Sequence, residues 1–187
     1  IMALYNGLDE GTSLELKFHN GILDPYSIEW EAMRNSNLFL QDLYEIAMSD
    51  KIVELSFSKQ NKYLFDGKFT MIDFEEPYDY DSRQDLWEIH WAKVRGESYG
   101  KRISGNLGQT LMPNARTDSK KSSTNENVQI IINSKGNINH RTMGLAHEFG
   151  HVILYLRGLP YSHQQLNVDK FINIRIKEMS ERLGYEY

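Results

Sequence analysis

The stretch Gly144–Gly158, GLAHEFGHVILYLRG, sets two histidines and a glutamate among apolar residues. The apolar spacing, followed by a glycine and a proline, predicts a helix over about residues 142–157. Such a helix is expected to be buried, and a polar group carried into an apolar setting needs a partner because its burial is otherwise costly. The sequence therefore predicts that His147, Glu148 and His151 share a bound partner.

The spacing of the two histidines is that of a zinc clamp. His147 and His151 lie four residues apart, so a helix presents both imidazoles on one face and toward one point. Glu148 is turned away from the two ligands but stays near enough to hold a water on the metal. From there it can take a proton as the water attacks a carbonyl and pass that proton to the leaving amine. The motif predicts a hydrolytic zinc site with Glu148 as the general base.

A catalytic zinc usually takes three protein ligands and keeps its fourth position for water, so a third ligand is expected. His163 is the only histidine downstream of the motif, and it follows the Gly158–Pro160 stop, where the chain can turn back toward the helix. The last predicted helix, about residues 168–183, offers carboxylates instead. The sequence leaves the choice open between His163 and these carboxylates, which are Asp169, Glu178 and Glu181.

Hydrophobic periodicity along the rest of the chain predicts an α+β fold in a single domain spanning residues 1–187. The N-terminal part, residues 1–100, is expected to supply helices and strands around a catalytic core at residues 101–187. Segment 86–94 fits a strand or a short helix. The other expected elements are a helix from Ser36 or Asn37 to about residue 47, a hairpin of strands at 53–57 and after Gly67, surface loops at 75–85 and 96–127, and a strand at Val128–Asn133.

Composition argues against several classes of function. The formal net charge of −5 and the pI near 5.7 give no electrostatic footprint for nucleic acid. The chain has no cysteine, so a metal must be held by His, Asp or Glu. No run of residues has the apolar length of a membrane span. The first residue is Ile1 rather than Met, so a processed form or a piece of a longer protein is expected, and the compartment stays open.

The segment HEFGH, preceded by NVQIIINS, resembles the zincin superfamily of zinc metallopeptidases. The stretch from GQTLMP through AHEFGHVILYLRGLPYSH is similar to the small bacterial metallopeptidase domains found at the ends of secreted or polymorphic-toxin proteins. The resemblance implies a zincin-like α+β fold, in which a mixed sheet packs on the active-site helix and a C-terminal helix follows. It also assigns zinc to His147 and His151 and the role of general base to Glu148. The three-histidine pattern of the metzincins is not matched, because its last position holds Arg157.

In zincins an edge strand aligns the substrate, and by this resemblance the strand at residues 128–133 is expected to hold an extended peptide through main-chain hydrogen bonds. The residues of that strand are Val128, Gln129, Ile130, Ile131, Ile132 and Asn133. The expected function is a zinc-dependent peptidase acting on a protein or peptide, as the toxin or effector domain of a larger exported protein. The alternative is a non-enzymatic zincin-like binding module with structural or absent zinc. Glu148 argues against that alternative, since a structural zinc site needs no base and normally closes with a fourth protein ligand.

Overall fold

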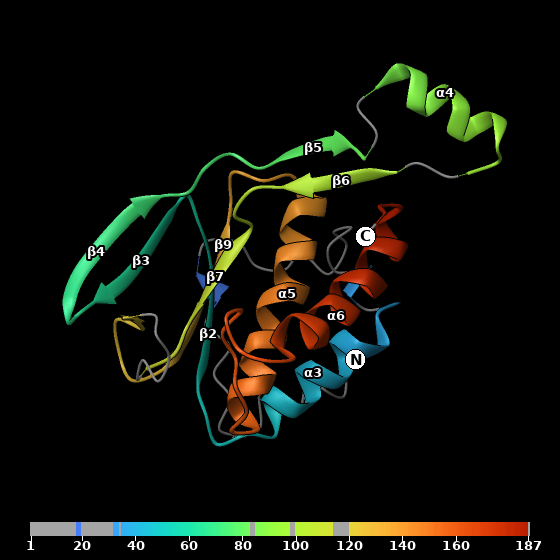
Figure 1. Cartoon of the computed structure of the whole chain (residues 1–187). Coiled ribbons are helices and arrows are strands. Elements are labelled where there is room, and N and C mark those ends of the chain that lie inside the picture. The colour runs from blue at the N-terminus through green and yellow to red at the C-terminus, as the bar shows by residue number, and fades with distance from the viewer. Residues whose placement is uncertain are drawn as a thin grey trace.

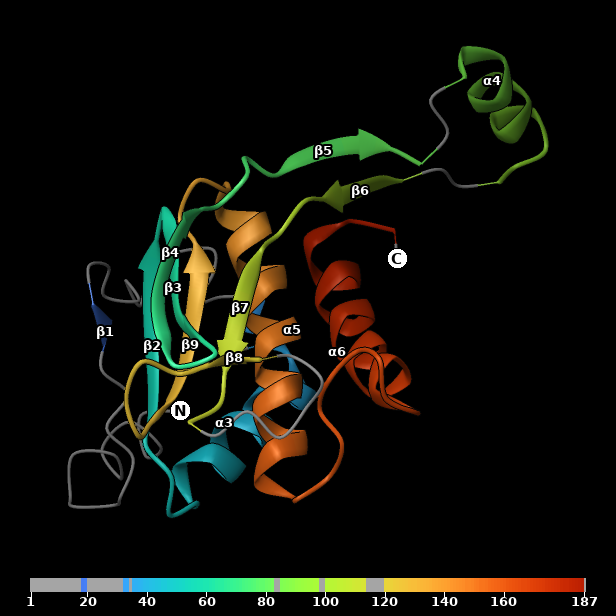
Figure 2. The same cartoon turned by 60° about the vertical axis from the view of Figure 1, so that its left-hand side comes forward.

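A mixed four-stranded sheet with helices on one side forms the centre of the molecule (Figures 1 and 2). The structure is a computed structural model, and it describes residues 18–19, 32–33, 35–82, 85–97, 100–113 and 120–186. The sheet has the order β1-β2-β9-β7, in which the first three strands are parallel and β7 runs antiparallel to β9. Its strands are β1 (Phe18–His19), β2 (Val53–Ser58), β9 (Val128–Asn133) and β7 (Gly108–Leu111). The α+β class expected from the sequence is confirmed.

Three helices lie on one side of this sheet: α3 (Asn37–Ala47), α5 (Ile138–Leu156) and α6 (Val168–Leu183). Helix α5 lies against β7 and β9, and α3 and α6 pack on α5. The ring of Phe39 in α3 stacks on that of Phe149 in α5, with centroids 4.6 Å apart. The predicted helices are confirmed, although α5 begins at Ile138 because the side chain of Asn137 caps it there.

A second, smaller sheet has the order β4-β3-β8 and packs near the other side of the main sheet. It consists of β3 (Gln60–Phe65), β4 (Lys68–Asp73) and β8 (Lys121–Ser122). Asp66 and Gly67 both have positive φ, as a two-residue hairpin turn requires, and they join β3 to β4. The predicted hairpin of residues 53–57 with the strand after Gly67 is therefore wrong. The first strand of the observed hairpin is β3, QNKYLF, which was not predicted because it lacks a clear apolar alternation.

An arm extends from the body beyond the main sheet (Figure 1). Strands β5 (Tyr78–Asp81) and β6 (Lys101–Ser104) form a two-stranded ribbon, and α4 (Leu86–Val94) lies at its end. Segment 86–94 is thus a helix. The expected loops at 75–85 and 96–127 are wrong in part, because they contain β5, β6, β7 and β8. These strands have two to four residues each, too few for periodicity to show.

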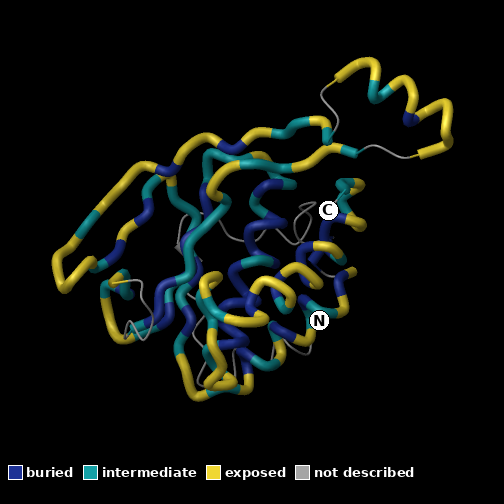
Figure 3. The backbone as a smooth tube through the Cα atoms, in the orientation of Figure 1, coloured by how far each residue is buried: buried dark blue, intermediate teal, exposed yellow. Residues whose placement is uncertain are grey.

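Buried residues gather where the main sheet meets the helices, while the arm and the β3–β4 hairpin are largely exposed (Figure 3). Strand β9 is the most deeply buried, since five of its six residues are classed as buried and none is exposed. A continuous apolar run of this kind is typical of a central strand covered on both faces. In the part of the chain that the structure describes, no helix combines the length and apolarity needed to cross a bilayer.

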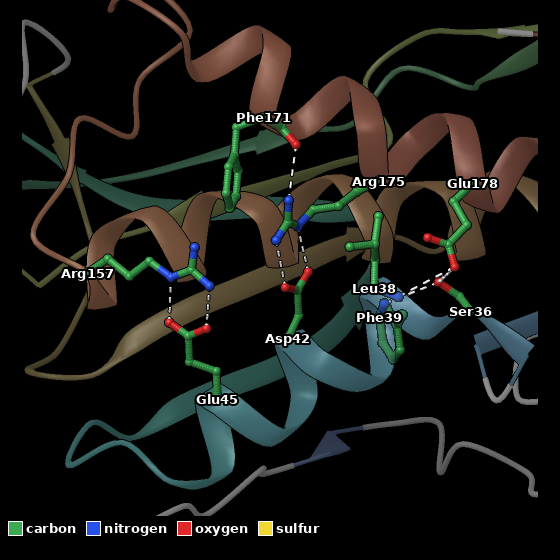
Figure 4. A network of polar contacts seen from close by, with 9 residues as sticks. All are labelled: Ser36, Leu38, Phe39, Asp42, Glu45, Arg157, Phe171, Arg175 and Glu178. Carbon is green, nitrogen blue, oxygen red and sulfur yellow. Dashed lines mark hydrogen bonds and ion pairs between the residues drawn. The ribbon is translucent and has the colours of Figure 1, made fainter.

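A buried ion pair joins α6 to α3 (Figure 4). The guanidinium of Arg175 donates to both carboxylate oxygens of Asp42, at 2.6 and 2.8 Å, and both side chains are less than a tenth exposed. The same guanidinium donates to the carbonyl of Phe171 and lies over the ring of that residue, 3.7 Å from its centroid. One turn further along α6, Glu178 accepts hydrogen bonds from Ser36 and Asn37 at the start of α3. These contacts fix the two helices to each other.

Replacing Asp42 with alanine is expected to lower the free energy of unfolding by roughly 3–5 kcal/mol, because Arg175 would remain buried without its counter-charge. Glu45 offers a matched control on the same helix. It pairs with Arg157 at 2.6 Å, but the two side chains are 34% and 45% exposed, and its replacement by alanine should cost at most about 1 kcal/mol. Urea unfolding measures both variants. If both variants lost the same free energy of unfolding, burial would not be what makes the Asp42–Arg175 pair important for stability.

Candidate functional site

Three histidine side chains meet at one point beside α5. The Nε2 atoms of His147 and His151 are 3.2 Å apart, and that of His163 lies 3.0 Å from the first and 3.1 Å from the second. Tetrahedral zinc with bonds of about 2.0–2.1 Å to nitrogen separates its ligand nitrogens by about 3.3 Å. Three nitrogen donors in this arrangement fit a zinc ion with one coordination position left over.

The protonation state of the two helical histidines also suits a metal. Burial is the main cause that lowers the pKa of His147 and of His151 to about 4, so both imidazoles are neutral at pH 7. Metal ligation requires neutral imidazole, since a protonated nitrogen has no lone pair to donate. The site therefore needs no proton release from these two rings to bind a cation at neutral pH.

A short loop after α5 brings His163 to the pair. Gly158 has a φ of +67° and ends the helix in the left-handed conformation that favours glycine. The chain then turns back, and the carbonyl of Tyr161 accepts a hydrogen bond from Nδ1 of His151 at 2.6 Å. The side chain of Gln165 accepts from the backbone N–H of Tyr161 and of Ser162, which holds the loop in its turn.

The outer ring nitrogens of two of the histidines are fixed by hydrogen-bond acceptors. Nδ1 of His151 faces a carbonyl, and Nδ1 of His163 faces the carboxylate of Asp169 at 2.6 Å. Because these oxygens only accept, each Nδ1 carries the proton and each Nε2 stays free for the metal. Partners of this kind orient a ligand ring and raise its basicity. Residues of the loop and of the start of α6 thus orient the imidazole rings of His151 and His163.

The structure separates the candidates for the third ligand. It places His163 beside the two helical histidines and makes Asp169 the hydrogen-bond partner of that histidine. Glu178 is on α6 and its carboxylate accepts backbone N–H groups at the start of α3, and Glu181 is exposed on the same helix α6. Neither of these two glutamates belongs to the group of donor atoms that come together. Among the described residues, that group consists of three histidines whose donor atoms lie within 4.8 Å of one another.

Glu148 lies in the same cleft and is 5% exposed. Its carboxylate accepts a hydrogen bond of 2.7 Å from the hydroxyl of Thr110, on β7. Burial raises the pKa of Glu148, an effect that His151 and the Thr110 hydroxyl partly oppose. Thr110 is not among the site residues predicted from the sequence, because its strand has four residues within a glycine-containing segment with the composition of a loop.

The cleft has a volume of about 480 Å³ and runs between β7 and the loop after α5. One wall is the strand β7 with the residues leading into it, and the other is formed by α5 and the loop. The residues that line it are Gly105, Asn106, Leu107, Gly108, Gln109, Thr110, Leu111, Met112, Lys121, His147, Glu148, His151, Tyr161, Ser162, His163 and Gln164. The three histidines and Glu148 therefore line one cleft.

Strand β7, and not β9, is the outer strand beside this cleft. The expectation that Val128–Asn133 forms the edge is wrong, because β9 pairs with β2 on one side and with β7 on the other. Its backbone groups are already used in the sheet and cannot bind a peptide. The error has a physical source: the clearest strand signal in a sequence belongs to an apolar strand in the centre of a sheet, while edge strands are short and polar.

The register of β7 shows which of its backbone groups face outward. The carbonyl of Leu107 accepts from the N–H of Asn133 in β9 at 3.0 Å. In an antiparallel pair this direction alternates, so Gln109 and Leu111 also face β9, while Gly108 and Thr110 turn their N–H and C=O groups toward the free edge. The N–H of Gly108 bonds to the side chain of Asn106. The carbonyl of Thr110 accepts from the side chain of Gln109, and the N–H of Thr110 stabilises the Glu148 carboxylate, so a peptide pairing with this edge would displace such side-chain contacts.

Two glycines of α5 permit close packing around the site. A Cβ on Gly144 would lie 3.0 Å from the carbonyl oxygen of Leu107, and one on Gly150 would lie 3.0 Å from the side chain of Ile172. The first contact lets α5 approach the chain leading into β7, and the second lets it approach α6. The glycine inside the HEFGH segment is thus explained by helix packing.

Comparison of the chain with family models, with curated proteins and with solved structures gave no match. The resemblance of the HEFGH segment to zincins therefore remains a hypothesis, and the geometry of the site is the basis for a proposed function. That site combines three imidazole nitrogens facing one point with a buried carboxylate in the same cleft, beside the free edge of a sheet.

Proposed function

We propose that this chain is a zinc-dependent peptidase with Glu148 as its general base. One observation carries the proposal: the three Nε2 atoms of His147, His151 and His163 lie 3.0–3.2 Å apart in the cleft that also holds the Glu148 carboxylate. A structural zinc site normally closes with a fourth protein ligand, and within the described residues this group has three members. The open position favours catalysis over a structural role.

The residues of the cleft supply the proton transfers that peptide hydrolysis needs. When bound, zinc supplies a Lewis acid that polarises the carbonyl group. Glu148 takes a proton from the attacking water as the water oxygen bonds to the carbonyl carbon. It then donates this proton to the amine nitrogen as the C–N bond breaks, which leaves a carboxylic acid and a free amine. The raised pKa of Glu148 suits a group that must take up a proton and release it again.

The substrate that best fits the cleft is an extended peptide along β7. A strand added to an open sheet edge gains main-chain hydrogen bonds, and Gly108 and Thr110 direct backbone groups to that edge. Such a peptide would pass over Glu148 and the three histidines. The similarity of the GQTLMP to PYSH stretch to toxin-type peptidase domains is the ground for proposing that the peptidase acts as part of a larger exported protein.

Zinc-loaded protein is expected to cleave an unfolded protein such as casein, and removal of zinc by chelation should reduce the rate by about 100-fold or more, because the Lewis acid is lost. Mass spectrometry of the products identifies the cleaved bonds. One equivalent of Zn²⁺ should restore the rate, and the same amount of Mg²⁺, which prefers oxygen ligands, should not. Absence of cleavage by the zinc-loaded chain across a broad peptide library would count against the proposal.

A further inference from the structure

The hydroxyl of Thr110 is the group that holds the Glu148 carboxylate. It lies 2.7 Å from Oε2 of Glu148 and 3.2 Å from the backbone carbonyl oxygen of the same residue. The backbone N–H of the same threonine also stabilises this carboxylate in its charged form. Threonine is branched at Cβ and therefore stiff at χ1, so its hydroxyl is a well-defined anchor. The orientation of Glu148 thus depends on a residue of β7, outside its own helix.

Gly108 completes a surface on β7 that is shaped around Glu148. Residues two apart in a strand share a face, so Gly108 and Thr110 both point toward α5. A Cβ on Gly108 would lie 3.1 Å from Cγ of Glu148 and equally close to the carbonyl oxygen of Ile131. Any larger residue would displace the glutamate side chain or the strand. Gly108 leaves room for the side chain of Glu148, and Thr110 hydrogen-bonds to its carboxylate.

The same two residues also present the free edge of the sheet. Their backbone groups point away from β9, toward the place where an extended peptide would pair. A peptide paired with β7 would therefore contact the backbone of the residue whose side chain holds the carboxylate. Thr110 would then set the distance between the peptide and Glu148, because its backbone pairs with the one and its side chain bonds to the other.

We infer that Thr110 is a positioning residue, which fixes the Glu148 carboxylate in register with a peptide bound along β7. The inference rests on the proposed peptidase function and adds to it a residue outside the HEFGH helix. Without the hydroxyl, the carboxylate loses its side-chain partner and keeps only the backbone N–H of Thr110, so it can turn about its own side-chain bonds. Misplacement of a reacting group by about 1 Å can cost about 100-fold in rate.

The kinetic test uses Thr110→Val, which keeps the shape of the side chain and removes its hydroxyl. With zinc content unchanged, kcat on a peptide derived from a casein cleavage site should fall by about 10- to 100-fold. KM should stay within about twofold, because the backbone edge of β7 is intact. Thr110→Ser restores the hydroxyl and should recover most of kcat. Thr142→Val is the matched control, since the buried Thr142 hydroxyl bonds to the carbonyl of Ile138 within α5, and kcat should not change.

A second measurement tests the contact itself without zinc or substrate. In metal-free protein, Thr110→Val should lower the melting temperature by roughly 4 °C, because a buried carboxyl group loses its hydrogen bond. The same substitution in a Glu148→Ala background should lower it by about half as much or less, since the hydroxyl then has only the backbone carbonyl of residue 148 as a partner. Equal shifts in both backgrounds would overturn the inference.

The outcomes separate this inference from the function on which it rests. If the zinc-loaded natural chain cleaves nothing, the proposed function fails and the positioning role fails with it. If the natural chain cleaves and Thr110→Val cleaves with an unchanged kcat, the positioning role alone is overturned. A loss of kcat in Thr110→Val that Thr110→Ser restores, together with a background-dependent melting shift, supports it.

Discussion

Replacing Glu148 with glutamine is expected to reduce peptide hydrolysis by about 1,000-fold while the chain keeps its zinc, because an amide cannot take the proton of the attacking water. The substitution preserves size, and the amide oxygen can still accept the hydrogen bond from Thr110. The three histidines remain in place, so the metal content should stay near one per chain. Measurement of kcat/KM together with elemental analysis tests both halves of the expectation.

The matched control for this variant is Glu181→Gln, which makes the same chemical change at an exposed position of α6. It should keep full activity, because it lies outside the cleft. If the Glu148 variant retained more than about a tenth of the natural activity, the residue would not be the general base. Loss of zinc in that variant would instead show that the carboxylate helps to hold the metal.

Replacing His163 with alanine should release the metal, so that zinc content falls from about one per chain to below about 0.1 after dialysis. Two histidines on one helix would remain, with no ligand on the opposite side of the ion. Peptide hydrolysis should fall with the zinc, by about 1,000-fold or more. Elemental analysis of dialysed protein and a competition titration with a zinc-binding dye would give occupancy and affinity.

The variant Asp169→Asn distinguishes the role of His163 as a metal ligand from the role of Asp169 as the residue that orients it. This variant keeps the imidazole of His163 and weakens the acceptor that orients its Nδ1, so zinc affinity should fall by only about 10- to 100-fold. A loss as large as that of His163→Ala would make Asp169 itself a ligand. Retention of zinc by His163→Ala would place the third ligand elsewhere.

The elements with long, strongly periodic patterns are those that the sequence predicted well. Helix α5, strand β9 and helix α6 each have a continuous apolar pattern and a clear start or stop. Strand β3 lacks apolar alternation and β7 has only four residues, so neither shows a period, and each gains its stability from pairing with distant segments. The residues within such a strand do not encode that pairing.

The metal site was predictable in part, for a related reason. His147, Glu148 and His151 are recognisable because one helix sets their geometry. His163 was one of four candidates, and only the path of the loop after Gly158 brings it near the other histidines. The role of Thr110 depends on the register of β7 against β9 and on the approach of α5, which are tertiary properties.

The three histidines lie within residues 147–163, whereas the strand that holds Glu148 comes from residues 108–111. In the proposed enzyme, metal binding and bond cleavage would therefore depend on different parts of the chain. A molecule in which β7 has come away from β9 would still have the helix and the loop that bind zinc, but it would lack the anchor of its base and the edge for its peptide. If the proposal holds, zinc content would report local folding around α5, and hydrolysis would report the completed sheet.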